Sequence, residues 1–417
     1  MRKNIIINVL IGVLTAALTT GVFFLGFYTY KWSLSDTERT LLEILDNYEE
    51  NYYYKSDDVI DVICDAIFDD YSTYYTPEEY ESVKSVNLGK SVGVGISMIK
   101  GSNEIYEVAI NSSAYQSGVK TGGKVILAKI GGKEYSGDDI STPLLSLSTG
   151  DEVELTIDYQ GDIEVYNLKK QVYNRSYVTY RNANGTFVYE DNNSAMNLVK
   201  YSDKSIGSGG VGYIKYTAFN GQKDDSYGSV YQMKTALEKF KADGNKTLIL
   251  DIRNNGGGYF NVLSPIAGML VEKHGENQVA SISKNRDGEI TYHYIKNNVY
   301  DSFGFEKIIV LANRKTASAS EVLIGAMLDY DTQNKVTVIL DGYESNGETV
   351  YKTYGKGIMQ TTYKYSNGSA IKLTTAKIYW PVSNLSIHGV GITTGISSKV
   401  LNAVNGDAYE YALSLLK

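Results

Sequence analysis

The sequence predicts an α/β protein whose largely parallel sheet follows a smaller, β-rich module. From Gly209 onward, short apolar runs alternate with segments in which apolar residues recur at helical spacing. Between Ser91 and about Val172, by contrast, β-type runs are separated by glycines. These two patterns are typical of different architectures, so we expect at least two domains.

Composition and charge exclude several classes of function. The 417 residues carry 48 acidic and 40 basic side chains, a formal net charge of −8, so a nucleic-acid partner would lack its electrostatic driving force. A single cysteine, Cys64, excludes an internal disulfide and a cysteine-rich metal site. Only three histidines are present, too few for most histidine-based metal cages or relays. We therefore expect no cofactor.

The N-terminal segment predicts a membrane anchor. No charged residue lies between Lys3 and Lys31, and Ile5 to Tyr28 is long and apolar enough to cross a bilayer as a helix. The alternative is a cleaved signal peptide, but no A-x-A-like cleavage site follows. With Arg2 and Lys3 on the cytoplasmic side, we expect a single-pass protein of the cell membrane with everything after Lys31 outside the cytoplasm.

The first part of the chain after the anchor is predicted to be helical, because apolar residues recur at helical spacing on both sides of residues 56–58. In the last part we expect strands near 211–216, 247–252, 308–311 and 336–340, and helices near 230–240, 260–271 and after 318. The polar segment 173–208 is predicted only as a loop or cap. The expected domains are a tip and anchor at 1–32, a helical segment at 33–85, a β module at 86–172 and an α/β domain at 173–417.

Ser318 is the candidate nucleophile. It lies in a run of small residues directly after the apolar strand that ends at Leu311 and directly before a helix. A hydroxyl at such a turn is exposed and lies beside helix-terminal N–H groups. Capping alone explains most serines at this position, so the assignment depends on a partner elsewhere in the chain.

Lys356 is the candidate general base. It lies between Gly355 and Gly357, ahead of a β-type segment, and flanking glycines let the backbone crowd around the amine and exclude water. A lysine acts as a base only when desolvation favours its neutral form. Gln360, four residues on, can accept or donate a hydrogen bond without adding charge. The alternative is a solvated lysine in a glycine turn.

The glycines Gly256, Gly257 and Gly258 follow a predicted strand that ends at Ile252. Such a turn lets backbone N–H groups converge on an oxyanion, although an ordinary strand-ending turn has the same composition. No phosphate-binding loop motif and no G-x-S-x-G motif occurs in the sequence.

Together these motifs resemble the carboxy-terminal processing peptidases, which are tail-specific serine peptidases. The resemblance extends from Leu41 to Lys417 and is carried, in order, by residues 212–214, 250–258, 317–321, 355–360, 373–376 with Pro381, and 387–392. It implies a crotonase-like α/β protease core. It also implies that Ser318 is the nucleophile, Lys356 the base and Gln360 the residue that positions it, with an oxyanion hole formed by the N–H of Ala319 and of Gly257 or Gly258.

The resemblance further implies an inserted all-β PDZ-like domain between the helical segment and the protease. Its carboxylate-binding loop would be Gly93, Val94, Gly95 and Ile96, where consecutive N–H groups capture a terminal carboxylate and the tail adds as a strand. The partners would be proteins or peptides with a free C-terminus. The oligomeric state, a homo-oligomer included, is left open.

Two departures from the family pattern bear on activity. Lys356 follows Ser318 by 38 positions, an unusually long interval, and the excess falls in Asp341 to Lys352. Gly256 stands where proline is usual. Three further polar residues are assigned to structure: Asp329 to a solvated or salt-bridged helix carboxylate, His388 to packing, and Glu321 to the helix dipole.

The sequence therefore predicts a membrane-anchored, extracytoplasmic serine endopeptidase that processes or degrades proteins by their C-terminal tails. The alternative, which the two departures keep open, is a catalytically silent, PDZ-containing peptide-binding scaffold on a protease-like fold.

Overall fold

The computed structural model describes residues 34–51, 59–207 and 209–416. The chain divides into two compact units, the first ending at Phe68 and the second beginning at Asp69. In the first unit, α2 (Asp36–Asn51) and α3 (Val59–Ile67) occupy the positions at which helices are predicted. The predicted anchor at Ile5 to Tyr28 lies outside the described residues, and no described helix has the length and apolarity to cross a membrane.

The second unit contains the β-rich module, whose core is separate from that of the α/β body. Its strands are β2 (Lys90–Gly93), β3 (Ile96–Met98), β4 (Ile105–Val108), β5 (Lys124–Ile130), β6 (Lys133–Ser136), β7 (Glu152–Tyr159), β8 (Asp162–Lys169) and β9 (Gln171–Asn174). They form a sheet in the order β6-β5-β7-β8 and the pairs β3-β4 and β2-β9.

The module is not composed of strands alone. It also contains α5 (Ser113–Gln116) and α6 (Ser141–Ser146), so the prediction of an all-β domain is wrong on this point. Ser112 caps α5 by accepting a hydrogen bond from the Tyr115 N–H at 3.2 Å. Both helices are too short for their apolar residues to show a helical period.

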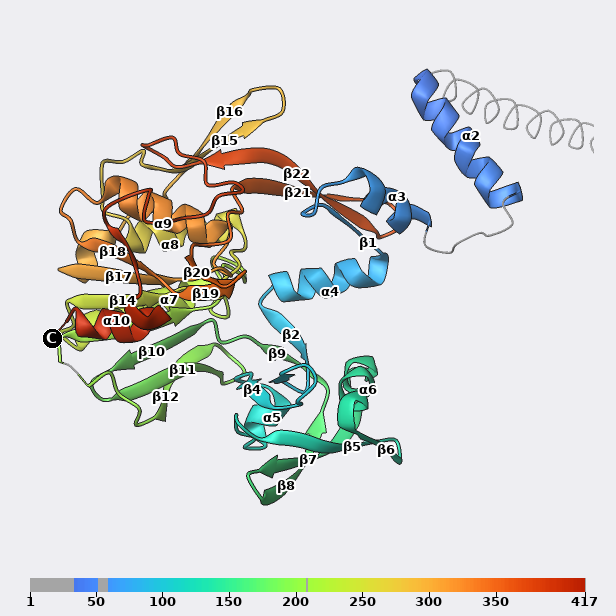
Figure 1. Ribbon diagram of the computed structural model, residues 1–417, viewed down its shortest axis with the longest axis horizontal. Coiled ribbons are helices and arrows are strands. Elements are labelled where there is room, and N and C mark those ends of the chain that lie inside the picture. Colours follow the sequence, from blue (N-terminus) through green and yellow to red (C-terminus); the bar gives the residue numbers. More distant parts are fainter. Residues whose placement is uncertain (1–33, 52–58, 208, 417) are drawn as a thin grey trace, which may run out of the picture. The chain divides into compact units, whose positions relative to one another are not determined.

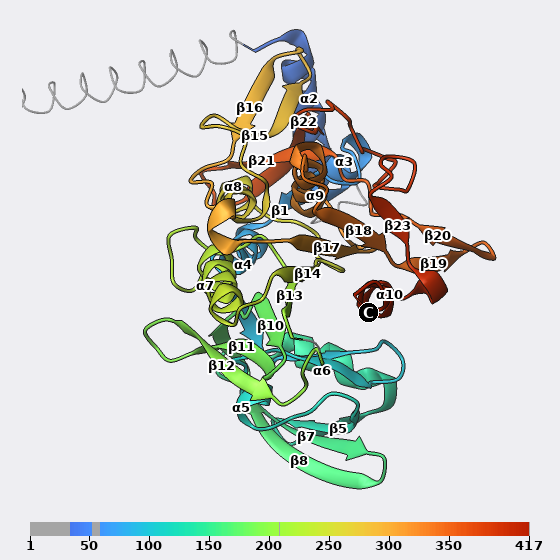
Figure 2. The ribbon, with the colours of Figure 1, turned by 90° about the vertical axis from the view of Figure 1, so that its left-hand side faces the viewer.

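The body is an α/β structure, as predicted, built on an eight-stranded sheet in the order β12-β11-β10-β13-β14-β17-β18-β23 (Figures 1 and 2). The parallel strands are β13 (Val211–Tyr216), β14 (Thr247–Asp251), β17 (Lys307–Ala312), β18 (Val336–Leu340) and β23 (Val400–Asn402). One face is covered by α7 (Ser229–Ala242), α8 (Phe260–Leu270) and α9 (Ala319–Tyr330), and the other by α10 (Ala408–Ser414). Leu248 and Leu250 face the first layer and Ile249 the second, which explains why this strand is apolar throughout.

The segment predicted as a loop or cap is instead an extension of this sheet. Its strands β10 (Val178–Asn182), β11 (Gly185–Asp191) and β12 (Met196–Ser202) pair antiparallel, and β10 pairs with β13. Val178, Tyr180 and Asn182 are buried while Thr179 and Arg181 are half-buried, so one face of β10 packs on the core. The Asn- and Gly-rich turns between these strands conceal this alternation in the sequence.

A second sheet holds the N-terminal residues of the second unit beside the site described below. It has the order β1-β22-β15-β16, with β21 paired to β22, and comprises β1 (Thr73–Tyr75), β15 (Val279–Asn285), β16 (Ile290–Tyr294), β21 (Ile358–Lys364) and β22 (Ala370–Tyr379). β1 pairs antiparallel with β22 and leads into α4 (Pro77–Asn87), which begins with a complete capping box at Thr76.

Candidate active site

Ser318 occupies a strained backbone conformation at the turn between β17 and α9. Its φ of 57° and ψ of −120° lie in a region that non-glycine residues rarely adopt, at a cost of about 1–3 kcal/mol. Neighbouring contacts hold the turn: the Ala317 N–H and the Ser320 hydroxyl both donate to the Asn255 carbonyl at 3.0 Å. The turn thus places a half-buried serine hydroxyl at the N-terminus of α9.

The carboxylate of Glu321 joins this turn to the one that carries the lysine. It is fully buried and accepts hydrogen bonds from the N–H groups of Ser318 (3.0 Å), Gly355 (2.8 Å) and Lys356 (2.9 Å), and from the Thr353 hydroxyl. Burial raises the pKa of Glu321, and these donors oppose the increase. The helix-dipole role predicted for Glu321 is therefore incomplete, because the same side chain also positions both turns.

Lys356 is half-buried, and its amine is oriented by two neighbours. Nζ donates to Gln360 Oε1 at 2.7 Å and lies 5.4 Å from the centre of the Tyr71 ring. Desolvation lowers the pKa of Lys356, the positive charge of Lys372 lowers it further, and Asp69 acts in the opposite direction. The amine of Lys356 therefore loses its proton more readily than that of a solvated lysine.

Gln360 is itself held by a residue that sequence reasoning missed. Its amide nitrogen donates to the carbonyl of Tyr71, which leaves the amide oxygen facing Lys356. The glycines beside the lysine are tightly packed, since a Cβ on Gly355 would come within 2.8 Å of the Gly391 nitrogen and one on Gly357 within 2.8 Å of the His388 nitrogen.

One cavity of about 680 Å³ brings the predicted protease residues together. Its lining includes Ser318, Ala319, Lys356, Gln360, Gly257 and Gly258. No direct hydrogen bond joins the Ser318 hydroxyl to the Lys356 amine, as is common for catalytic pairs without substrate. Side chains from β1 and α4 also line this cavity, so the N-terminal part of the unit forms one of its walls.

The glycine turn approaches the serine closely. Gly257 has a φ of +97°, and a Cβ there would lie 2.8 Å from the Ala319 nitrogen and 2.9 Å from the Ser318 Cβ. The Gly257 N–H donates to the Asn255 side chain at 2.9 Å, whereas those of Gly258 and Ala319 have no hydrogen-bond partner among the described residues. Of the two glycines predicted for an oxyanion hole, Gly258 therefore offers the free donor.

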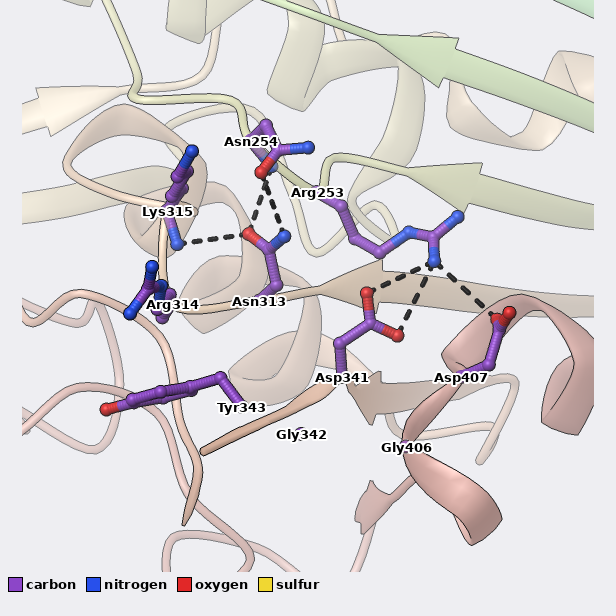
Figure 3. A pocket seen from close by; sticks show the side chains of 10 residues that line it. All are labelled: Arg253, Asn254, Asn313, Arg314, Lys315, Asp341, Gly342, Tyr343, Gly406 and Asp407. Atoms are coloured by element: carbon purple, nitrogen blue, oxygen red, sulfur yellow. Dashed lines mark hydrogen bonds and ion pairs between the residues drawn. The ribbon is translucent and has the colours of Figure 1, made fainter. Parts of the chain in front are cut away.

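The loop that precedes the serine is fastened to the loop that precedes the glycines (Figure 3). Asn254 N–H donates to Asn313 Oδ1 and Asn313 Nδ2 donates to Asn254 Oδ1, both at 3.0 Å. In the same region Arg253 forms ion pairs with Asp341 (3.1 Å) and Asp407 (3.7 Å). These contacts hold the carboxyl ends of β14, β17 and β18 in fixed relation.

The four residues predicted to bind a carboxylate lie at a separate cavity of about 360 Å³. Gly93, Val94, Gly95 and Ile96 line it together with residues of α6, including Leu144 and Leu145. β3, which begins at Ile96, pairs only with β4 among the described strands. This leaves one edge of β3 available to an added strand.

The remaining predictions concern residues outside the centre of the site. Asp329 is neither merely solvated nor salt-bridged: its Oδ2 accepts from the N–H groups of Val382 and Ser383, both at 2.9 Å, and so orders that loop. His388 packs 6.1 Å from the Tyr71 ring. The excess residues Asp341 to Lys352 form the hairpin of β19 (Gly342–Ser345) and β20 (Glu348–Tyr351), and none of them lines the cavity that contains Ser318.

Comparison with known proteins agrees with this arrangement. Residues 210–398 match the model of peptidase family S41. Two curated relatives named "Probable CtpA-like serine protease", from Staphylococcus saprophyticus and Staphylococcus aureus, are 26% and 29% identical over 94% of this chain and 72% of theirs. A Bacteroides fragilis protein named as an S41 protease has a similar fold, with a TM-score of 0.52 at 16% identity, over 87% of this chain and 90% of that one.

Glu321→Gln is expected to slow acylation of Ser318 about 100-fold, the usual effect of misplacing reacting groups by about 1 Å. The NH2 group of glutamine replaces one carboxylate oxygen and is itself a donor. At least one of the buried N–H groups is then left without an acceptor, which lowers the free energy of unfolding by about 1–3 kcal/mol. The rate is measured with a serine-directed acylating probe and the stability by urea unfolding. Wild-type values in both measurements would contradict the role given to this carboxylate.

Gly257→Ala is expected to abolish acylation of Ser318, because the new Cβ would lie 2.8 Å from the Ala319 nitrogen in a backbone conformation that disfavours side chains. Gly256→Ala is the matched control, since a Cβ at Gly256 meets no atom within 4 Å. Probe labelling and circular dichroism of both variants distinguish a blocked site from a misfolded protein. Equal labelling of the two variants would show that Gly257 does not pack closely against the Ser318–Ala319 turn.

The pH dependence of Ser318 acylation is expected to report the pKa of Lys356. The rate should rise with pH as the amine loses its proton, and the midpoint should lie below that of an ordinary lysine. Lys372→Met removes a repelling charge and should move the midpoint to higher pH, whereas Asp69→Asn removes an attracting one and should move it to lower pH. Shifts in the same direction would exclude Lys356 as the titrating group.

Proposed function

Because the chain belongs to peptidase family S41 and is a serine protease, we propose that it is an endopeptidase with a Ser318–Lys356 dyad that cleaves proteins recognised by their C-terminal tails. The observation that carries this proposal is the Glu321 carboxylate, which binds the backbone of both residues of the dyad. A scaffold without catalysis would have no need to hold these two turns together.

In the proposed reaction, neutral Lys356 takes the proton of the Ser318 hydroxyl while Oγ attacks the scissile carbonyl. The tetrahedral intermediate collapses when the C–N bond breaks and the lysine returns its proton to the leaving amine. Water, deprotonated by the same lysine, then attacks the acyl-enzyme, the C–Oγ bond breaks, and the lysine returns this proton to Ser318 Oγ. Gln360 keeps the amine aimed during these transfers through its hydrogen bond to Nζ.

The developing oxyanion would be stabilised by the N–H groups of Ala319 and Gly258. Both lack a partner within the described chain, and both belong to the cavity that contains the serine. The Ser318 N–H is unsuitable because it already donates to Glu321. The positive end of α9 adds to the stabilisation.

Tail recognition is assigned to the loop Gly93 to Ile96. A free C-terminus would place its carboxylate against the N–H groups of this loop and its preceding residues along the open edge of β3. Ile96, Met98, Leu144 and Leu145 supply apolar contacts in the same cavity. The favoured tails are therefore apolar, and the module acts as a PDZ-type receptor.

We further propose that the catalytic unit acts outside the cytoplasm, held to the membrane by the apolar segment Ile5 to Tyr28. The reaction as proposed requires neither metal nor organic cofactor. Neither departure from the family pattern obstructs the proposed site, because the insertion between β18 and Thr353 does not line the cavity and a Cβ at Gly256 would meet no atom within 4 Å.

Ser318→Ala is expected to abolish cleavage of an unfolded reporter protein with an apolar C-terminus, measured by gel electrophoresis of the products. Amidating the reporter's C-terminus should raise KM about tenfold, the effect of losing roughly 1.4 kcal/mol of binding, with little change in kcat. Turnover by the alanine variant would refute the dyad. An unchanged KM for the amidated reporter would refute tail recognition while leaving the peptidase chemistry in place.

A further inference from the structure

A second groove on the protease body lies next to the cavity that contains Ser318, and the two share lining residues. It measures about 820 Å³ and lies among α7, α8, the 3-10 helix η2 (Tyr300–Phe303) and β16, which Figure 2 shows on one side of the main sheet. Much of its lining is apolar, with contributions from Phe260, Pro265, Met269, Val299 and Phe303. None of these side chains has a role in the chemistry proposed above.

The groove and the catalytic cavity share a boundary. Phe260 and Asn261 line both, and they open α8 directly after the glycine turn and Tyr259. Phe260 is held in place by the His293 ring, whose centre lies 4.4 Å away. An extended polypeptide that leaves the cavity past Phe260 would therefore enter the groove.

The outer wall of the groove exposes apolar side chains beside an open strand edge. Tyr292, Tyr294 and Val299 are 51%, 49% and 43% exposed. Among the described strands β16 pairs only with β15, so no strand covers its other edge; the Tyr294 carbonyl accepts a hydrogen bond from the Ser264 hydroxyl of α8 at 2.8 Å. Exposed apolar groups next to a free edge mark a surface suited to binding an extended chain.

The rim of the groove carries uncompensated positive charge. Lys223 pairs with Asp224 and Lys234 with Glu238, both at 3.3 Å, whereas Lys241 and Lys296 form no ion pair with any described residue. The chain as a whole has a net charge of −8, so this rim differs from the average surface. A ligand with carboxylates beside its apolar residues would complement it.

We propose that this groove binds a segment of the polypeptide substrate that lies beyond the scissile bond and carries apolar side chains flanked by carboxylates. The inference rests on the proposed function, because it takes the occupant of the groove to be the chain being cleaved. The groove then acts as a second recognition site that selects among the proteins delivered by their tails. The boundary that Phe260 and Asn261 form between the groove and the catalytic cavity favours a substrate over a separate partner.

The groove is tested first by binding, in Ser318→Ala protein so that cleavage does not interfere. The probe is a fluorescein-labelled peptide with a leucine- and phenylalanine-containing centre flanked by aspartates, amidated at its C-terminus to prevent capture as a tail. The double variant Tyr292→Ser/Val299→Asp should raise Kd about tenfold in fluorescence anisotropy, as expected for losing an apolar anchor. Lys241→Glu/Lys296→Glu should also raise Kd and weaken its dependence on salt.

Tyr365→Ser is the matched control, because Tyr365 is 50% exposed and does not line the groove. It should leave Kd unchanged. If both double variants bind the peptide as well as the control does, the proposal is overturned. It is also overturned if sedimentation shows that the variants dissociate an oligomer without any change in peptide affinity, since the occupant would then be a second copy of the chain.

Kinetics on active protein separate this inference from the proposed function. For a long substrate that contains the same acidic and apolar segment, Tyr292→Ser/Val299→Asp should raise KM about tenfold. A short peptide confined to the catalytic cavity should be cleaved at an unchanged rate. If the double variant changes the cleavage of both substrates equally, the proposal that the groove binds substrate is overturned. If wild-type protein cleaves neither substrate, the proposed function fails, and the binding measurement still decides whether the groove recognises such segments.

Discussion

The Glu321 carboxylate is the constraint on which the proposed site depends. Burying a charged carboxylate is costly unless hydrogen bonds replace its hydration, and here three backbone N–H groups and one hydroxyl do so. Two of the three N–H groups belong to the turn of Lys356 and one to Ser318, so the compensation is complete only when the two turns lie together. The same contact stabilises the unfavourable backbone conformation of Ser318 and occupies its N–H, which leaves Ala319 and Gly258 as the donors of the proposed oxyanion hole.

The candidate residues could be selected from the sequence because each stands in a recognisable local pattern, and their proposed roles come from the resemblance that these patterns carry together. Ser318 follows a strand and precedes a helix, and Lys356 lies between two glycines. Gln360 lies four residues after Lys356. What holds these residues could not be predicted in the same way. Tyr71 binds Gln360 across 289 positions, and no local pattern marks a backbone carbonyl as a partner. Glu321 did carry a signal, since a serine followed three residues later by glutamate is a capping pattern, but its bonds to the lysine turn are tertiary.

In the fold as well, the elements with a local sequence pattern could be predicted, whereas those that depend on tertiary pairing could not. Apolar runs and helical periodicity predicted the parallel strands β13, β14, β17 and β18 and the helices α7, α8 and α9, but not β23 or α10. The region 173–208 was predicted wrongly because its polar turns outweigh the half-buried strands between them. The wall that β1 and α4 contribute to the catalytic cavity depends on pairing between Thr73–Tyr75 and β22, which has no sequence signature. The groove beside α8 likewise arises only when α7, η2 and β16 are brought together.

Native-state hydrogen exchange of the backbone amides of Ser318, Gly355 and Lys356 tests this account most directly, because all three donate to one carboxylate. The account predicts that the three amides are protected to a similar degree and become exposed in the same opening event. Strong protection of the Ser318 amide with rapid exchange at Gly355 and Lys356 would contradict it, since the serine and lysine turns would then be held independently.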